Sequence, residues 1–203
     1  LVYSIYQLLR YKKETDSKKQ LYKNIGILFS ASSIANSLWI FAWHYNVIWL
    51  SFFLIIVVLI CLIKINIILK NNDFPMLEQF TVKLPFTVYF GWITVATIAN
   101  ATTFLVSINW NGFTLSDIFW TNLILGIGAL IGIIGVQTYK SFAYGLVIIW
   151  AYFGIALKHL SPEQFNGRYP SVIITVCISI LLLVLSQIFL LRGIENKKLL
   201  KSS

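Results

Sequence analysis

The chain has 203 residues, of which 58% are hydrophobic and only 11% charged, and its mean hydropathy is +0.80. A soluble domain of this composition would lack the polar residues needed to cover its surface, so an integral membrane protein is favoured. The net charge of +9 would suit a nucleic-acid-binding protein. The basic residues lie between apolar segments rather than in one patch, which excludes nucleic acid as a partner.

The chain begins with LVYSIYQLL, an apolar run that ends before Arg10 and Tyr11. Its composition resembles the last turns of a helix that descends into the cytoplasm. A signal peptide would carry its basic residues before the apolar run and small residues after it. We therefore expect that at least one helix precedes Leu1.

Six apolar segments follow, and each is long enough for a helix to cross the hydrocarbon core of a bilayer. The connections after Trp43 and Val136 are so short that the helices they join must be antiparallel. The fold class is expected to be all-α, a polytopic helical membrane bundle that forms a single transmembrane domain over residues 1–203. The six expected spans are residues 25–43, 47–69, 84–107, 118–136, 141–157 and 171–191.

Prolines, glycines and a capping motif predict where helices begin and where they approach each other closely. Pro85 and Pro170 are expected at helix starts, where a missing N–H is tolerated. The sequence Ser161-Pro-Glu-Gln164 has the pattern of a capping box and predicts a short surface helix. Gly128 and Gly132 form a GxxxG pair, which predicts close approach of another helix. We favour a contact within the chain, and a homodimer is the alternative.

The basic residues predict the orientation of the helices. If the six segments all cross the membrane, all but Lys158 and Arg168 of the 16 Lys and Arg fall on one side. By the positive-inside rule, that side is cytoplasmic and includes the C-terminus. We expect a multi-pass protein of a bacterial cytoplasmic membrane, in contact with membrane lipids.

Polar and aromatic residues inside the spans give the best indication of function, because lipid offers them no hydrogen-bond partner. At helical spacing, Asn36, Trp39 and Trp43 share one face of the first span. A second set lies on one face of the third span, and two further indoles lie in the same half of the membrane. The predicted ligand-binding residues are Asn36, Trp39, Trp43, Trp92, Ala96, Asn100, Trp120 and Trp150.

Structural explanations compete with this hypothesis. Tryptophan concentrates at membrane interfaces, and Trp49, Trp110 and Trp120 fit such a belt. Asn36 and Asn100 would equally well join the first and third spans by an interhelical hydrogen bond, worth roughly 0.6 to 2 kcal/mol. Neither explanation excludes contact with a ligand.

Two segments carry a resemblance to a known family. ILFSASSIANSLWIF, with Asn36 and Trp39, and LPFTVYFGWITVATIAN, with Trp92, Ala96 and Asn100, resemble the signatures of the TspO/MBR family of tryptophan-rich sensory or translocator proteins. The resemblance covers about residues 21–107. It implies that the first three spans correspond to the third, fourth and fifth helices of the family's five-helix fold. Residues 1–107 would then be a TspO-like part without its first helices, and residues 108–203 would add three helices.

The resemblance implies a binding or sensory protein that holds a flat hydrophobic ligand, either a tetrapyrrole or a lipid or sterol. The pocket positions would be Asn36 and Trp39 from the first motif and Trp92, Ala96 and Asn100 from the second. The family's tyrosine after the proline is Phe86 here. No cofactor other than such a tetrapyrrole is indicated.

Two other functions remain open at the level of sequence. The runner-up is a transporter of small solutes or lipids, although the spans show no buried Asp, Glu or Arg that would couple transport to an ion gradient. An enzyme that degrades porphyrin is the third hypothesis. The chain contains no Ser-His-Asp set, paired acids, HExxH motif or phosphate-binding loop, so no catalytic residue is predicted.

Overall fold

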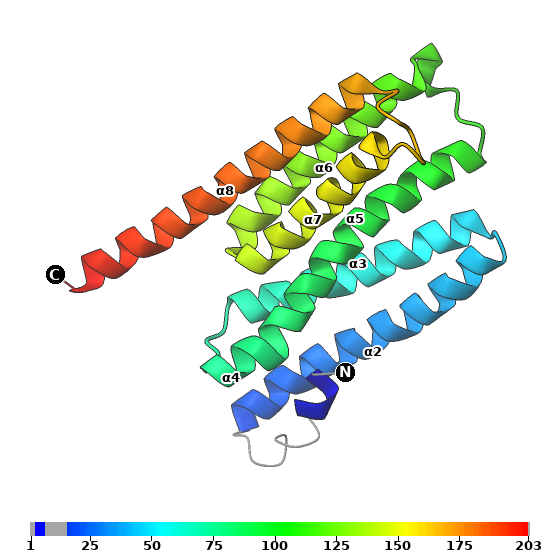
Figure 1. Ribbon diagram of the computed structural model, residues 1–203. Coiled ribbons are helices and arrows are strands. Elements are labelled where there is room, and N and C mark those ends of the chain that lie inside the picture. Colours follow the sequence, from blue (N-terminus) through cyan, green and yellow to red (C-terminus); the bar gives the residue numbers. More distant parts are fainter. Residues whose placement is uncertain (1–2, 7–15, 203) are drawn as a thin grey trace. The chain divides into compact units, whose positions relative to one another are not determined.

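A computed structural model describes residues 3–6 and 16–202, with side chains for all of these except 17 and 194–202. Every regular element in these ranges is helical, and six helices are long and apolar enough to cross a membrane (Figure 1). The predicted all-α membrane bundle is therefore confirmed. Residues 7–15 and the side chains of the C-terminal tail, which supply much of the basic charge used to predict orientation, lie outside the described part.

The chain divides into two compact units, Leu1–Asn109 and Trp110–Ser203. The division falls close to the expected boundary between residues 107 and 108. The interpretation of 1–203 as one domain stays a prediction, and so does the assignment of its two parts.

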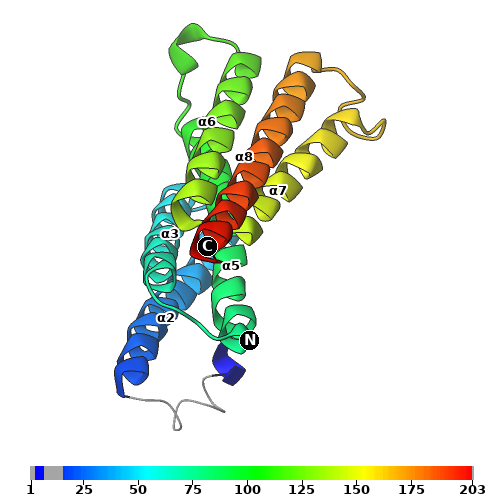
Figure 2. The same cartoon turned by 90° about the vertical axis from the view of Figure 1, so that its left-hand side faces the viewer.

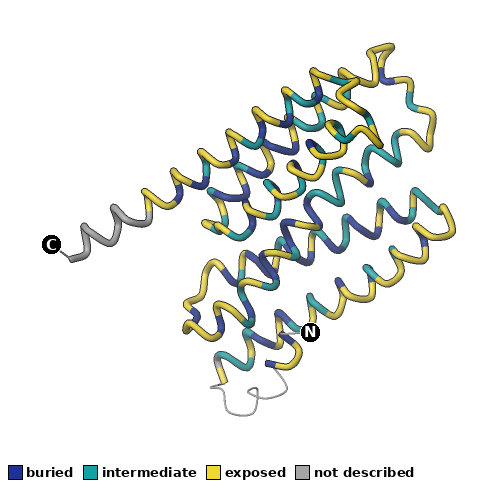
Figure 3. The backbone as a smooth tube through the Cα atoms, in the orientation of Figure 1, coloured by how far each residue is buried: buried dark blue, intermediate teal, exposed yellow. Residues whose placement is uncertain are grey.

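The first unit is built on α2 (Asp16–His44), α3 (Ile48–Lys70) and α5 (Leu84–Ser107). A turn at Asn46, which has a positive φ of 58°, reverses the chain between α2 and α3. Helix α3 packs against both α2 and α5, and it carries far more buried positions than α2 (Figure 3). A nearly continuous apolar sequence such as that of α3 is what a central helix requires, since it meets protein on more than one side.

Hydropathy located the membrane-crossing part of α2 but not its beginning. The helix starts at Asp16 instead of near Ile25, and Lys19 pairs with Asp16 at 3.1 Å in its first turn. Lysine is a good helix former, and an acidic residue in the first turn suits the helix dipole. The polar turns before the span therefore continue the same helix.

The prediction that Pro85 lies at a helix start is confirmed for α5, which begins at Leu84 and carries Pro85 in its first turn, but the helical structure as a whole begins earlier. Helical structure begins at α4 (Met76–Glu78) and continues through a π-helical segment, η2 (Gln79–Lys83), into α5. In a regular α-helix the proline ring would collide with the carbonyl of Thr81. The wider π turn, in which the Leu84 amide bonds to the Gln79 carbonyl, admits the proline without ending the helix.

The second unit consists of α6 (Asp117–Tyr139), α7 (Phe142–Leu160) and α8 (Pro170–Ser202). Helix α8 packs against both α6 and α7, which also pack against each other (Figure 2). The short helix predicted at Ser161–Gln164 is absent, and successive turns occupy this segment. The Ser161 carbonyl accepts from the amides of Gln164 and Asn166, and Asn166 and Gly167 then adopt positive φ values, which stop helical propagation.

Glycines allow the helices of the second unit to approach closely. A Cβ at Gly132 would meet Leu183 of α8 and Ile148 of α7, each at about 3 Å, so this glycine of the GxxxG pair serves a contact within the chain. At Gly135 a Cβ would overlap the ring of Tyr144, which is fully buried. The ring occupies the space that glycine leaves free on α6.

We predict that Gly135→Ala destabilises the protein by about 1 to 3 kcal/mol, because the added methyl group displaces a buried ring. Gly126→Ala on the same helix is the control, since nothing lies within 4 Å of its Cβ position. The midpoint of unfolding in detergent should fall for the first variant only. Equal midpoints for the two variants would contradict the close packing of Tyr144.

Candidate functional site

Asn100 of α5 joins the three long helices of the first unit. Its side-chain oxygen accepts a hydrogen bond from Trp39 Nε1 of α2 at 3.1 Å and another from Ser51 Oγ of α3 at 2.9 Å. Its amide nitrogen donates to the carbonyl of Ala96, one turn earlier, at 2.9 Å. Asn100 and Ser51 are buried. One amide oxygen thus fixes α2, α3 and α5 at the same level.

The alternative explanation, a hydrogen bond between Asn36 and Asn100, is not realised, because Trp39 of α2 makes the bond to Asn100 instead. Trp39 and Trp43 stack, with ring centroids 6.0 Å apart and planes 29° from parallel. Asn36 lies one turn before Trp39 and is half-buried, and its amide has no hydrogen-bond partner within the described part of the chain. Helix α2 therefore carries, at successive turns, the Asn36 amide and then the stacked indoles of Trp39 and Trp43.

A second contact between α2 and α5 lies nearer their beginnings. Phe29 and Phe86 pack edge to face at 5.4 Å, and Tyr3 packs against both rings, at 5.6 Å and 4.8 Å. The two contacts bracket about 15 Å of α2, from Phe29 to Trp39, and about 21 Å of α5, from Phe86 to Asn100. We call this stretch, together with Trp43 one turn beyond Trp39, the α2–α5 face.

The remaining candidates of the first unit belong to this stretch of α5. Trp92 is 48% exposed and precedes Asn100 by about two turns. Ala96 is half-buried between them and supplies the carbonyl that orients the Asn100 amide.

Trp120 and Trp150 belong to the second unit. The Trp120 indole donates to the Gly112 carbonyl at 2.8 Å and packs against Trp110 at 4.6 Å. A Cβ at Gly112 would collide with this indole, and the backbone of Gly112 has a positive φ, so both the contact and the conformation favour glycine here. Trp150 is 63% exposed on α7. These contacts give Trp120 a structural role within its own unit, and its assignment as a ligand-binding residue, like that of Trp150, stays a prediction.

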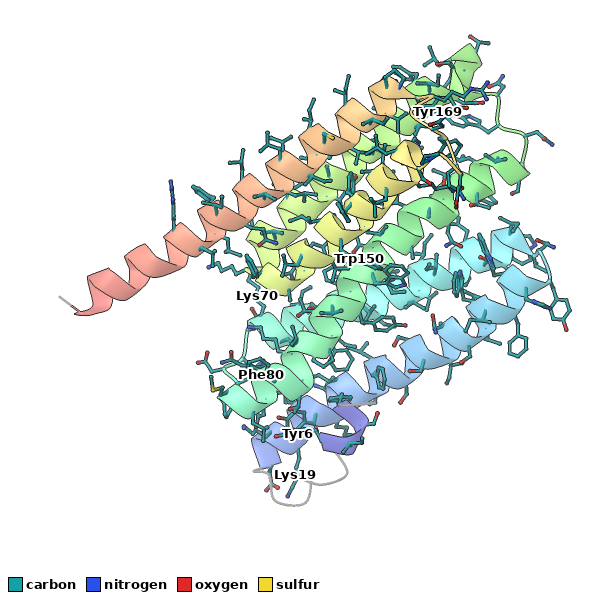
Figure 4. The ribbon with its side chains drawn as sticks, in the orientation of Figure 1. Tyr6, Lys19, Lys70, Phe80, Trp150 and Tyr169 are labelled. Atoms are coloured by element: carbon teal, nitrogen blue, oxygen red, sulfur yellow. The ribbon has the colours of Figure 1, made fainter. Side chains whose placement is uncertain are left out.

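Sequence reasoning missed a buried charge in the first unit. Glu78 of α4 is 4% exposed, accepts from the Tyr6 hydroxyl at 3.0 Å and pairs with Lys18 at 2.7 Å. Both bonds go to Oε1, and the buried Oε2 has no hydrogen-bond partner within the described residues. Figure 4 shows Tyr6 where the helical residues 3–6 meet α2. Glu78 lies before the apolar span, so hydropathy gave no signal of its burial.

The two histidines engage neighbouring groups of their own units. His44 packs edge to face on Tyr45, and the His159 Nδ1 lies 2.9 Å from the Ile155 carbonyl. No group of three His, Cys, Asp or Glu side chains that would hold a metal ion occurs among the described residues.

We predict that Asn100→Ala lowers stability by about 1 to 3 kcal/mol, because the Ser51 hydroxyl and the Trp39 indole both lose their acceptor. Thr103→Ala is the control, since the Thr103 hydroxyl bonds only to the Ala99 carbonyl of its own helix. Unfolding midpoints in detergent measure the difference. A loss no larger than that of the control would refute the role of Asn100 in joining the helices.

The comparisons with known proteins bear on the chain as a whole. No curated protein and no solved structure matches it. A family model described as TSPO-like protein matches residues 1–189. The match extends well beyond the motifs in residues 21–107 and includes most of the second unit. This multi-pass membrane protein therefore belongs to the family of TSPO-like proteins.

Proposed function

We propose that the first unit binds a flat hydrophobic ligand, of tetrapyrrole or sterol type, on the α2–α5 face. The observation that carries the proposal is the grouping of the stacked Trp39–Trp43 pair with the Asn36 amide and the Asn100 hydrogen bonds. Trp92, Ala96 and these four residues are the proposed binding residues. Trp150 is left as a separate exposed indole of the second unit.

The chemistry of these side chains suits such a ligand. Indole faces stack on planar rings, and binding sites for small molecules combine apolar walls with a few polar groups that orient the ligand. Trp39 has its N–H committed to Asn100, so its ring orientation is fixed before a ligand binds. A ring held in place loses little conformational freedom on binding.

The dimensions of the face support a ligand of intermediate size. The Phe29–Phe86 contact lies toward one end of the face and the Trp39–Asn100 hydrogen bond toward the other, with Trp43 one turn beyond Trp39. The intervening 15 to 21 Å, about ten to fourteen helical residues, suits a macrocycle or a sterol better than a metabolite of a few atoms.

We expect protoporphyrin IX to quench the tryptophan fluorescence of the purified full-length protein saturably. Trp92→Leu and Asn36→Ala should each weaken binding by about tenfold, since each removes a ligand contact without touching the Asn100 bonds. Trp49→Leu is the matched control, because Trp49 is an exposed indole at the start of α3.

Quenching that does not saturate, or that all three variants change equally, would indicate partition of porphyrin into detergent. That result would reject tetrapyrrole binding on this face. Repetition with a fluorescent sterol then separates a different ligand from the absence of a binding site.

The buried Glu78 favours transport as a second candidate function. Buried ionisable residues within membrane-spanning segments commonly mark ion pathways. Glu78 precedes the span expected at residues 84–107, but the stretch Met76–Ser107 that contains it is long and apolar enough to cross a membrane. If Glu78 couples solute movement to a cation gradient, Glu78→Gln should abolish gradient-driven uptake by proteoliposomes while preserving the acceptor for Tyr6. Asp16→Asn, at an exposed ion pair, is the control. Background uptake by the unmodified protein would exclude transport of the solutes tested.

A further inference from the structure

We propose that the loop between α7 and α8 binds the phosphate of an anionic phospholipid headgroup through Lys158 and Arg168. The inference concerns the second unit alone and is independent of the function proposed for the first.

The loop folds back on the end of α7. The Gly167 amide donates to the His159 carbonyl at 2.9 Å, and the Arg168 amide donates to the Phe165 carbonyl at 2.9 Å. These bonds bring Phe165 onto the His159 ring, at 4.7 Å between centroids, and Tyr169 onto Phe165, at 5.4 Å. The result is a small aromatic cluster at the end of the helix, and Figure 4 shows Tyr169 at the start of α8.

Each cation lies on one ring of this cluster. Lys158 Nζ is 5.5 Å from the centre of Phe165, and Arg168 Cζ is 5.7 Å from the centre of Tyr169. Both basic residues are exposed. Among the described side chains, the ion pairs involve Lys18 and Lys19 and not these two, although Glu163 belongs to the same loop. Two positive charges thus lie on adjacent rings of one aromatic cluster, and neither is in an ion pair among the described side chains.

The position of the loop selects a lipid as the partner. Helices α7 and α8 are both of membrane-spanning type, and the loop joins the last residue of one, Leu160, to the first of the other, Pro170. The loop must therefore lie at the level of the headgroups. There an ammonium and a guanidinium meet phosphate diesters, and arginine offers these a pair of parallel donors.

The charge distribution adds an independent argument. In the expected topology, Lys158 and Arg168 are the only basic residues on their side of the membrane. Positive charge on that side opposes the usual bias. Lys158 and Arg168 nevertheless both lie on one aromatic cluster. Binding of an anionic headgroup would account for positive charge at this place.

The test compares lipids that share acyl chains and differ in headgroup charge. Native mass spectrometry of the full chain in detergent should show phosphatidylglycerol bound in preference to phosphatidylcholine. The double variant Lys158→Gln, Arg168→Gln should lose about 30-fold in affinity for phosphatidylglycerol, as expected for two cations at a membrane surface. Binding of phosphatidylcholine should not change.

Two further variants make the test specific. Lys140→Gln, Arg192→Gln removes the same charge from the second unit and should retain the preference, as should the charge-preserving Lys158→Arg, Arg168→Lys. Equal losses in both charge-removing variants, or no preference in the unmodified protein, would overturn the proposal. Displacement of the lipid by equimolar glycerol phosphate would assign the site to a free phosphate and would also overturn it.

Discussion

The hydrogen bonds of Asn100 are the interaction on which the first unit depends. Lipid does not drive helices together by the hydrophobic effect, so their arrangement rests on close packing and on polar contacts. Here a single buried oxygen accepts from α2 and from α3, while the amide nitrogen is tied to α5 itself. Loss of this oxygen leaves two donors without an acceptor.

This arrangement links stability to the proposed function. Trp39 supplies one of the donors and also one of the two stacked indoles of the proposed binding face. The structural and ligand-binding interpretations of these residues are consequently compatible. A bond that holds the helices also sets the orientation of the ring that a planar ligand would meet.

The second unit reaches close packing by a different route. Its glycines let side chains such as the Tyr144 ring approach the helix backbone, and Gln187 of α8 donates to the Phe142 carbonyl at 3.0 Å. Gly145 leaves the space in which the Gln187 amide lies. The second unit thus relies on small residues and a polar contact where the first unit relies on the hydrogen bonds of Asn100. Both close packing at small residues and interhelical hydrogen bonds are known to hold helices together in lipid.

The sequence by itself determined the membrane environment, the six helices and the family, because apolar length and local motifs are properties of contiguous residues. It also indicated that a polar contact would join the first and third spans, between Asn36 and Asn100. Only the tertiary structure decided that Trp39, not Asn36, reaches Asn100, and that Ser51 shares the acceptor. It alone revealed the burial of Glu78 against Tyr6 and Lys18. Such contacts depend on the rotation and crossing of helices, which packing between distant segments sets and which periodicity does not encode.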